Sequence, residues 1–244
     1  MSRGKMMMIH NMSYEERFVS STASVLEQHG IGITLGTDFD EYRSQLIAER
    51  PDHEIGAPFD PELHNFNKTN AFWMIGRNRQ GEIMHTQAIR LLDLGRGTLG
   101  DYFSKSFRDF PPPGVPIDMK RSQYRVGPGA NRMKGQVAYH GEFWIGGRLG
   151  EYRGSGISTV LCRLGFWEAF QRWDLDHMVG FMAQSVAFKG WVERAGWMHT
   201  DPNALRWALK GKETMIEGFL AYLHREDFHF LLNVPEAQRF AKAA

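Results

Sequence analysis

A glycine-rich turn joins a predicted strand to a predicted helix in the second half of the chain. The turn runs from Glu151 to Ser158, between an apolar run at 137–146 and an amphipathic run at 157–172. Such a turn leaves backbone N–H groups unpaired at the helix N-terminus, where the helix dipole adds partial positive charge. Gly154 and Gly156 let the backbone approach an anion closely. The sequence therefore predicts a phosphate-binding turn that needs no basic side chain.

Two common phosphate motifs do not fit this turn. No Gly-Lys-Ser/Thr follows it, as the Walker motif requires, and Thr159 stands where the dinucleotide fingerprint needs a third glycine or alanine. The pattern Glu151-x-x-Gly154-x-Gly156 instead resembles motif A of the GCN5-related N-acetyltransferase (GNAT) superfamily, the acyl-coenzyme A N-acyltransferases. Glu151 departs from the glutamine or arginine that the family favours at this position.

A second motif follows in the order that the same superfamily shows. The segment from Gln184 to Trp197, with Ala187 and Gly196 inside it, resembles motif B and comes after an apolar strand-like run at 177–183. The resemblance covers about residues 137–200. It implies a GNAT-like fold, in which an α/β (α+β) chain forms a mixed, mostly antiparallel central sheet flanked by helices.

Local patterns place the remaining elements. Ser13 and Glu16 form a capping box for a helix that ends near Gln28, and the turn at 78–81 predicts a hairpin. We expect further helices at 38–49, 97–107, 184–195 and 214–223, and strands at 32–36, 71–75, 83–92 and 207–210. The 244 residues then form a single GNAT-like domain (1–244), with an N-terminal helical extension (1–29), a coenzyme-binding core (137–200) and a C-terminal extension (224–244).

The resemblance also implies an activity and a binding site. We expect transfer of an acyl group, in the simplest case from acetyl-CoA, to a small amine or amino-acid-like acceptor. Motif A, the end of the preceding strand and the start of motif B would bind the coenzyme; these residues are Gly146, Gly147, Arg148, Tyr152, Arg153, Gly154, Ser155, Gly156, Ile157, Ser158 and Gln184.

Glu142 is the leading candidate for the general base that neutralises the amine. In the histone acetyltransferase branch a catalytic glutamate lies six residues before the last pantetheine-pairing residue of this strand, which Arg148 would match. His140 lies two residues before Glu142 and would share its face on an unbroken strand. Val192 stands where motif B often carries a tyrosine that protonates the leaving thiolate. Either another group such as Ser185 or Tyr139 supplies that proton, or the thiolate leaves with help from solvent.

Two alternative functions stay open at this stage. Phe59-Asp-Pro-Glu-Leu-His64, followed by Gly81-Glu-Ile83, loosely resembles an acidic segment of the autoinducer synthases and N-acyl amino acid synthases, which transfer long acyl chains. A non-catalytic acyl-CoA sensor is the other alternative, which the valine in motif B favours.

Composition restricts the partners and the compartment. The net charge of +1 gives no bulk reason to expect nucleic acid or a membrane, and no nucleic-acid motif occurs. One cysteine, Cys162, allows no intrachain disulfide, and no signal peptide is visible, so we expect a cytoplasmic protein. The histidines show no metal spacing, and we expect no metal. A homodimer remains open. A basic stretch would contact the coenzyme 3′-phosphate, an anionic substrate or an acyl carrier protein, unless it is a solvated loop; its residues are Lys120, Arg121, Arg125, Arg132 and Lys134.

Overall fold

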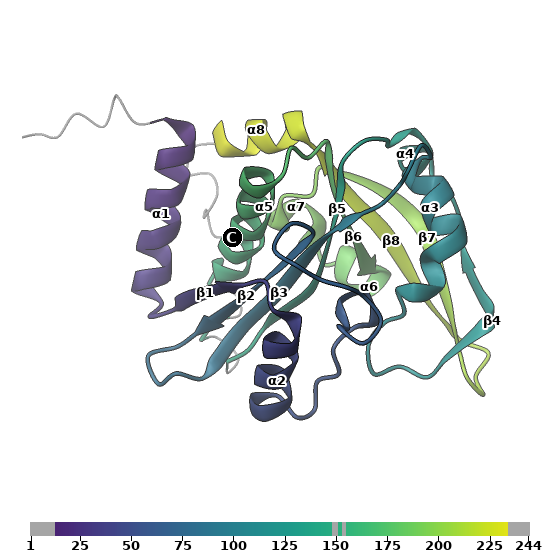
Figure 1. Ribbon diagram of the computed structural model, residues 1–244, viewed down its shortest axis with the longest axis horizontal. Helices are drawn as coiled ribbons and strands as arrows, with labels where there is room; N and C mark the ends of the chain where they lie inside the picture. Colours follow the sequence, from purple (N-terminus) through teal and green to yellow (C-terminus); the bar gives the residue numbers. More distant parts are fainter. Residues whose placement is uncertain (1–12, 148–150, 153–154, 234–244) are drawn as a thin grey trace, which may run out of the picture.

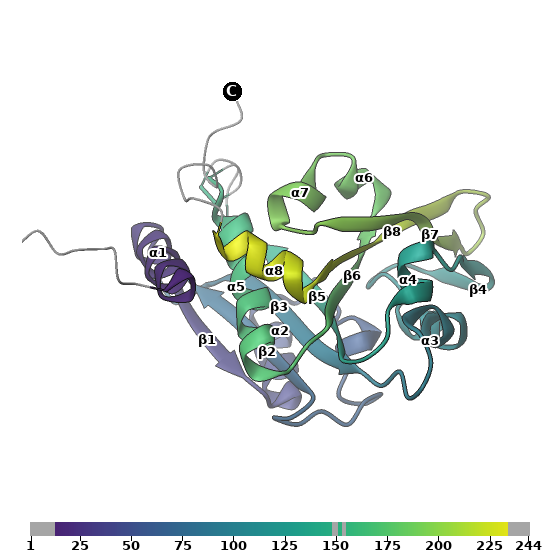
Figure 2. The same ribbon diagram turned by 90° about the horizontal axis from the view of Figure 1, so that it is seen from above.

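The computed structural model describes residues 13–147, 151–152 and 155–233. These residues form an eight-stranded sheet with helices on both faces (Figures 1 and 2). The strands lie in the order β1-β2-β3-β5-β6-β8-β7-β4. Their bounds are β1 (Gly32–Gly36), β2 (Ala71–Arg77), β3 (Ile83–Leu92), β4 (Ile117–Tyr124), β5 (Val137–Ile145), β6 (His177–Ala183), β7 (His199–Leu209) and β8 (Met215–His224).

All neighbouring strands are antiparallel except β5 and β6, which run parallel. The predicted mixed, mostly antiparallel sheet flanked by helices is therefore confirmed. The parallel pair is connected through α5 (Ile157–Arg172), as the strand-helix-strand unit predicted. In the part of the chain that the structure describes, no helix has the length and apolar character that crossing a membrane requires.

The helices divide into two groups on opposite faces of the sheet (Figure 2). One face carries α1 (Tyr14–Gln28), α5, α6 (Gln184–Ala187), α7 (Trp191–Ala195) and α8 (Arg225–Asn233). The other carries α2 (Phe39–Glu49), the short 3-10 turns η2 (Ala57–Phe59) and η3 (Phe107–Asp109), α3 (Leu99–Ser106) and α4 (Pro128–Arg132). Each face of the sheet contributes to its own buried hydrophobic cluster. Tyr139 and Val179 lie in one cluster, and Ala138 and Met178 lie in the other. Strand alternation explains this division.

Several local predictions are confirmed. The Ser13 hydroxyl accepts a hydrogen bond from the Glu16 N–H, and the Glu16 carboxylate accepts one from the Ser13 N–H, so the capping box begins α1. The bounds of α5 and β6 agree with the apolar patterns. Cys162 is buried on α5.

Three other predictions are wrong. Residues 215–224 form a strand rather than a helix, because β6 and β7 pair with both edges of this segment. The expected helix at 184–195 is two short helices, because Gly190 takes a left-handed conformation with φ of 72°. The basic stretch is not one loop: Lys120 and Arg121 lie on the edge strand β4, and Arg132 ends α4.

Candidate active site

The two parallel strands separate part way along their length. β5 and β6 pair only from Val137–His177 to Tyr139–Val179. Beyond that point, within the described residues, no strand pairs with the edge of β5 that faces β6. An opening between two strands leaves main-chain N–H and C=O groups that a ligand can bind.

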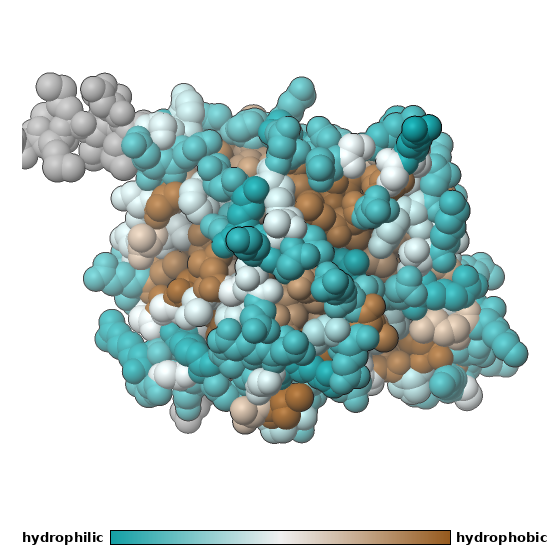
Figure 3. Space-filling view, viewed as in Figure 1, coloured by the Kyte–Doolittle hydropathy of each residue, from teal (hydrophilic) through white to brown (hydrophobic). Residues whose placement is uncertain are grey.

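A cavity of about 400 Å³ lies in this opening. It is lined from both separated strands, among them by Tyr139, Glu142 and Phe181, and also by the loop around Gly56 and the start of α7 at Trp191. Figure 3 shows apolar side chains (brown) at the surface over β5, β6 and β8, the strands around the opening. Most of the lining is aromatic or aliphatic, with few polar groups, which is typical of a small-molecule site.

The helix α5 begins beside the end of β5. Gly156 precedes its first turn with φ of 84°, a left-handed conformation that favours glycine, and no side chain caps the helix there. Among the described residues, the Ile157 N–H reaches the Ser155 hydroxyl, at 3.4 Å. The 16-residue helix thus presents weakly engaged N–H groups at its positive end, as the motif predicted.

Of the remaining residues expected to bind coenzyme, those that follow β5 lie near this turn where they are described, and Gln184 begins α6. Gly147 has φ of 84°, and a Cβ there would meet the ring of Tyr152, which is buried. Ser158 is half-buried in the first turn of α5. Gly146 directly follows β5. The side-chain amide of Gln184 donates a hydrogen bond to the Asn203 side chain. Arg148, Arg153 and Gly154 lie outside the described residues.

A β-bulge at Glu142 shapes the cavity wall. Ala88 of β3 pairs with Gly141 but Thr86 pairs with Trp144, so β5 holds one residue more than its partner strand over this interval. Glu142 has φ of 53°, which costs a non-glycine residue about 1–3 kcal/mol. The Thr86 hydroxyl donates to the Glu142 carbonyl at 2.9 Å and holds the bulge.

The bulge separates the two catalytic candidates of β5. The expectation that His140 and Glu142 share a face is wrong, because the inserted residue breaks the strand alternation. Glu142 turns toward the α2 face, where its carboxylate accepts hydrogen bonds from His53 Nε2 and from the Gly56 N–H, each at 2.9 Å. The Glu142 side chain is only 4% exposed.

His140 lies on the opposite face in an aromatic box. Its Nε2 donates to Gln87 at 2.8 Å, and its ring contacts Phe143, Phe166 and Trp197. Burial, with a smaller contribution from His85, lowers the pKa of His140 to about 3. A base with so low a pKa takes no proton from an ammonium at neutral pH, so this environment argues against His140 as the general base.

The two candidates for the proton donor differ in position. Tyr139 lines the cavity where β5 and β6 separate, and burial, followed by the nearby Glu142, raises the pKa of its hydroxyl. It therefore stays protonated at neutral pH, as a proton donor must before the thiolate leaves, although the raised pKa makes it a weaker acid. Ser185 is exposed on α6 and does not line the cavity. Val192 is buried in α7.

Sequence reasoning did not identify His53. It lies in a polar, proline-bounded stretch that carries no recognisable spacing, and only the folded chain brings it to Glu142. The acidic residues of the neighbouring segment do not line the cavity, because Asp60 and Glu62 pair with Arg43 at the surface. The edge strand β4 with its basic residues lies beyond β6, β8 and β7 from β5, which separates it from the α5 turn.

Comparison with known proteins gives structural matches only. No protein-family model matches the sequence, and no curated protein is significantly similar to it. Solved structures match over about four fifths of the chain at low identity. NAA60 of Arabidopsis thaliana in complex with acetyl-CoA has 9% identity and a TM-score of 0.43, with 80% of this chain and 99% of that chain covered.

Two further matches have comparable scores. The ribosomal-protein-S5-alanine acetyltransferase of Vibrio fischeri has 11% identity and a TM-score of 0.44, covering 82% of this chain and 95% of its own. FeeM, an N-acyl amino acid synthase from uncultured soil microbes, has 12% identity and a TM-score of 0.40, covering 82% of this chain and 93% of its own. Likenesses this distant carry no conclusion about activity.

Proposed function

We propose that this chain is an acyl-coenzyme A-dependent N-acyltransferase of the GNAT type that acts on a small amine. The observation that carries the proposal is the separation of β5 from β6 after Tyr139, beside the uncapped N-terminus of α5. A pyrophosphate fits the helix N-terminus, and an extended pantetheine arm fits main-chain groups that have no strand partner. The residues that would hold the coenzyme are Gly156, Ile157, Ser158 and the end of β5.

The chain's own groups match the needs of acyl transfer. Acyl-coenzyme A supplies the activated carbonyl; the amine nitrogen bonds to that carbon and the C–S bond breaks. The Glu142–His53 pair lines the cavity and would take the proton that the ammonium must lose. Tyr139 would return a proton to the leaving thiolate. The apolar walls exclude water and so protect the thioester from hydrolysis.

A long-chain acyltransferase is the second candidate, and the cavity favours it. An acetyl group would occupy a small part of about 400 Å³, whereas the lining continues to Phe110, Leu205 and Trp207. That space suits either an acyl chain or an apolar acceptor.

Thioester cleavage across a panel of acyl donors and amines tests the proposal. We expect acyl-coenzyme A to raise the melting temperature, because a ligand of the native state stabilises it. We expect free thiol to appear only when an amine is added. The dependence on donor chain length separates the two enzyme candidates. Binding without turnover on any amine would favour the sensor, and no thermal shift at millimolar donor would refute the coenzyme site.

A further inference from the structure

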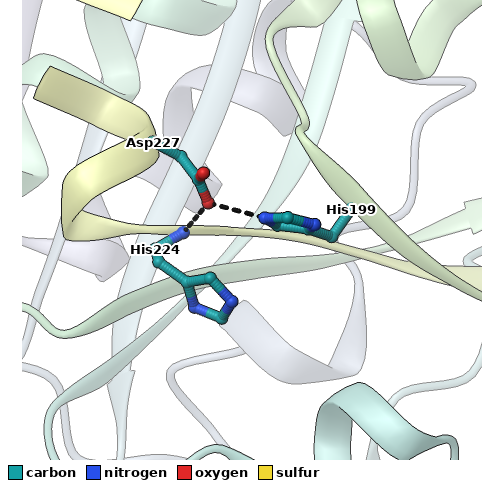
Figure 4. A group of neighbouring side chains, drawn as sticks. All are labelled: His199, His224 and Asp227. Atoms are coloured by element: carbon teal, nitrogen blue, oxygen red, sulfur yellow. Dashed lines mark hydrogen bonds and ion pairs between the residues drawn. The ribbon is translucent and has the colours of Figure 1, made fainter. Parts of the chain in front are cut away.

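Three potential metal ligands meet at one corner of the sheet. His199 begins β7, His224 ends β8, and Asp227 lies in the first turn of α8. One donor atom from each lies within 4.8 Å of the others. Figure 4 shows the two rings and the carboxylate gathered there from three elements. The spacing of these three residues along the chain does not match a familiar metal-binding motif, which is why the sequence predicts no metal.

The contacts among these groups are already close. His199 Nε2 lies 2.9 Å from Asp227 Oδ2, and the same oxygen accepts the His224 backbone N–H at 2.7 Å. In a tetrahedral zinc site with bonds of about 2.0–2.1 Å, neighbouring donors are roughly 3.3 Å apart. The His199–Asp227 pair is already near this distance, whereas the His224 contact involves its backbone. The ring nitrogen of His224, within 4.8 Å of the other two donors, must move closer to enclose an ion. The His199 side chain is 41% exposed, which provides an entry path and room for water.

His177 is placed to orient one of the ligands. It begins β6, and its Nδ1 lies 2.7 Å from Nδ1 of His224. Because that contact engages Nδ1 of His224, Nε2 is the nitrogen left for a metal. A metal on Nε2 fixes the remaining proton on Nδ1, which then donates to His177. Ligating histidines commonly have such a partner, which sets the tautomer and the ring orientation.

Carboxylates outnumber the basic side chains that act on these histidines. Asp227, Glu226 and Asp176 act electrostatically on the two histidines of this contact, and Arg132 opposes them. We propose that His199, His224 and Asp227 bind one divalent transition-metal ion of the zinc class, with His177 as a positioning residue. Two imidazoles and one carboxylate, with room for water, form a recognised zinc donor set.

The site lies away from the cavity. His177 is at the start of β6, whereas Gly180–Ala183 at the other end of that strand line the cavity. The ion would connect α8 to β7 and β8, so its expected effect is on stability rather than on acyl transfer. This inference does not depend on the proposed function.

Metal titration of the tag-free, metal-stripped protein tests the site. With Zn²⁺ followed by calorimetry and Co²⁺ followed by its visible absorption, we expect one ion per chain and a higher melting temperature. His199→Ala should lose the binding and the thermal shift. His177→Gln should weaken affinity roughly 10- to 100-fold, as expected for a residue that orients a ligand. His229→Ala is the matched control, because His229 is exposed on the same helix.

Three results would overturn the proposed metal site. Retention of parent affinity by folded His199→Ala, or the absence of Zn²⁺ and Co²⁺ binding in the parent protein, overturns the proposal. If His199→Ala does not fold without metal, His224→Gln takes its place and the same loss is expected. An equal loss in His229→Ala would indicate nonspecific histidine binding and would also overturn it.

Discussion

The carboxylate of Glu142 and the ring of His53 lie 2.9 Å apart although 89 residues separate them in the chain. The bulge in β5 directs Glu142 toward the loop that carries His53, and that loop adds a second hydrogen bond through Gly56. A residue in a costly backbone conformation persists only when its surroundings hold it there. Here the holding contacts also position a carboxylate–imidazole pair at the cavity wall, which makes the pair the first target for mutagenesis.

Glu142→Gln should reduce acyl transfer by about 10²-fold or more, the usual size for loss of a general base. The amide keeps the shape, and its oxygen is still able to accept a hydrogen bond from His53, but it cannot take the proton. The affinity for coenzyme should change little, because the α5 turn is unaltered. Turnover against pH and acyl-coenzyme A binding are the measurements. An unchanged rate and pH profile would refute the assignment.

His53→Gln should reproduce most of that loss, since the two groups act as one unit. The double variant should then be little slower than either single variant. Glu62→Gln is the matched control: Glu62 is a largely exposed carboxylate paired with Arg43, and it does not line the cavity. Additive effects of Glu142→Gln and His53→Gln would mean that the pair does not function as a unit.

Gly156→Ala should weaken coenzyme binding by about tenfold or more, because loss of a hydrogen bond to a charged group costs about 1.5–3 kcal/mol. The left-handed backbone adds about 1–2 kcal/mol of strain. Gly81→Ala controls for strain alone: Gly81 has φ of 85°, open space around it and a place in the β2–β3 hairpin. Both variants should lose similar stability in urea unfolding, and only Gly156→Ala should lose coenzyme affinity. Equal affinity in both would exclude the turn as the phosphate site.

Tyr139→Phe tests the proton donor. We expect turnover to fall by about 10²-fold while coenzyme affinity is retained, because the departing thiolate loses its proton donor. The variant also loses the hydrogen bond between the Tyr139 hydroxyl and the Phe181 backbone. Tyr124→Phe is the control, since its hydroxyl is also buried but has no hydrogen-bond partner among the described residues, and Tyr124 does not line the cavity. Should Tyr139→Phe turn over at the parent rate, solvent must supply the proton.

Local chemistry made part of the fold predictable. The capping box at Ser13, the hairpin before Ile83 and the apolar stripe of α5 each arise from neighbours in sequence. Tertiary pairing decided the rest: Met215–His224 carries a helix-like pattern, yet two neighbouring strands draw it into the sheet. The candidate site was predictable where a motif or the family resemblance marks it, at Gly156 and at Glu142. A bulge has no sequence signature, so the reversed direction of Glu142 and its contact with His53 could not be foreseen.

Two buried histidines should make the fold sensitive to acid. Burial, countered in part by a hydrogen bond to the Trp144 backbone, lowers the pKa of His85 from 6.5 to about 4. Burial, together with His85, lowers that of His140 to about 3. The unfolded chain therefore binds protons below pH 6.5 that the folded chain does not bind, so stability is complete above that pH and falls as the pH decreases. The contribution of each histidine to the free energy of unfolding should be about 2 kcal/mol smaller near pH 5 than near pH 7.5.

Urea unfolding of the parent and His140→Phe at these two pH values measures this effect. The variant loses the bond to Gln87, so its absolute stability changes, but the difference between the two pH values should shrink by about 2 kcal/mol. That difference isolates the titration from the packing change. His229→Ala, which removes an exposed histidine, should keep the parent difference. If His140→Phe keeps it as well, His140 binds its proton equally well in the folded and unfolded chains, and its box of aromatic rings does not exclude the charged form.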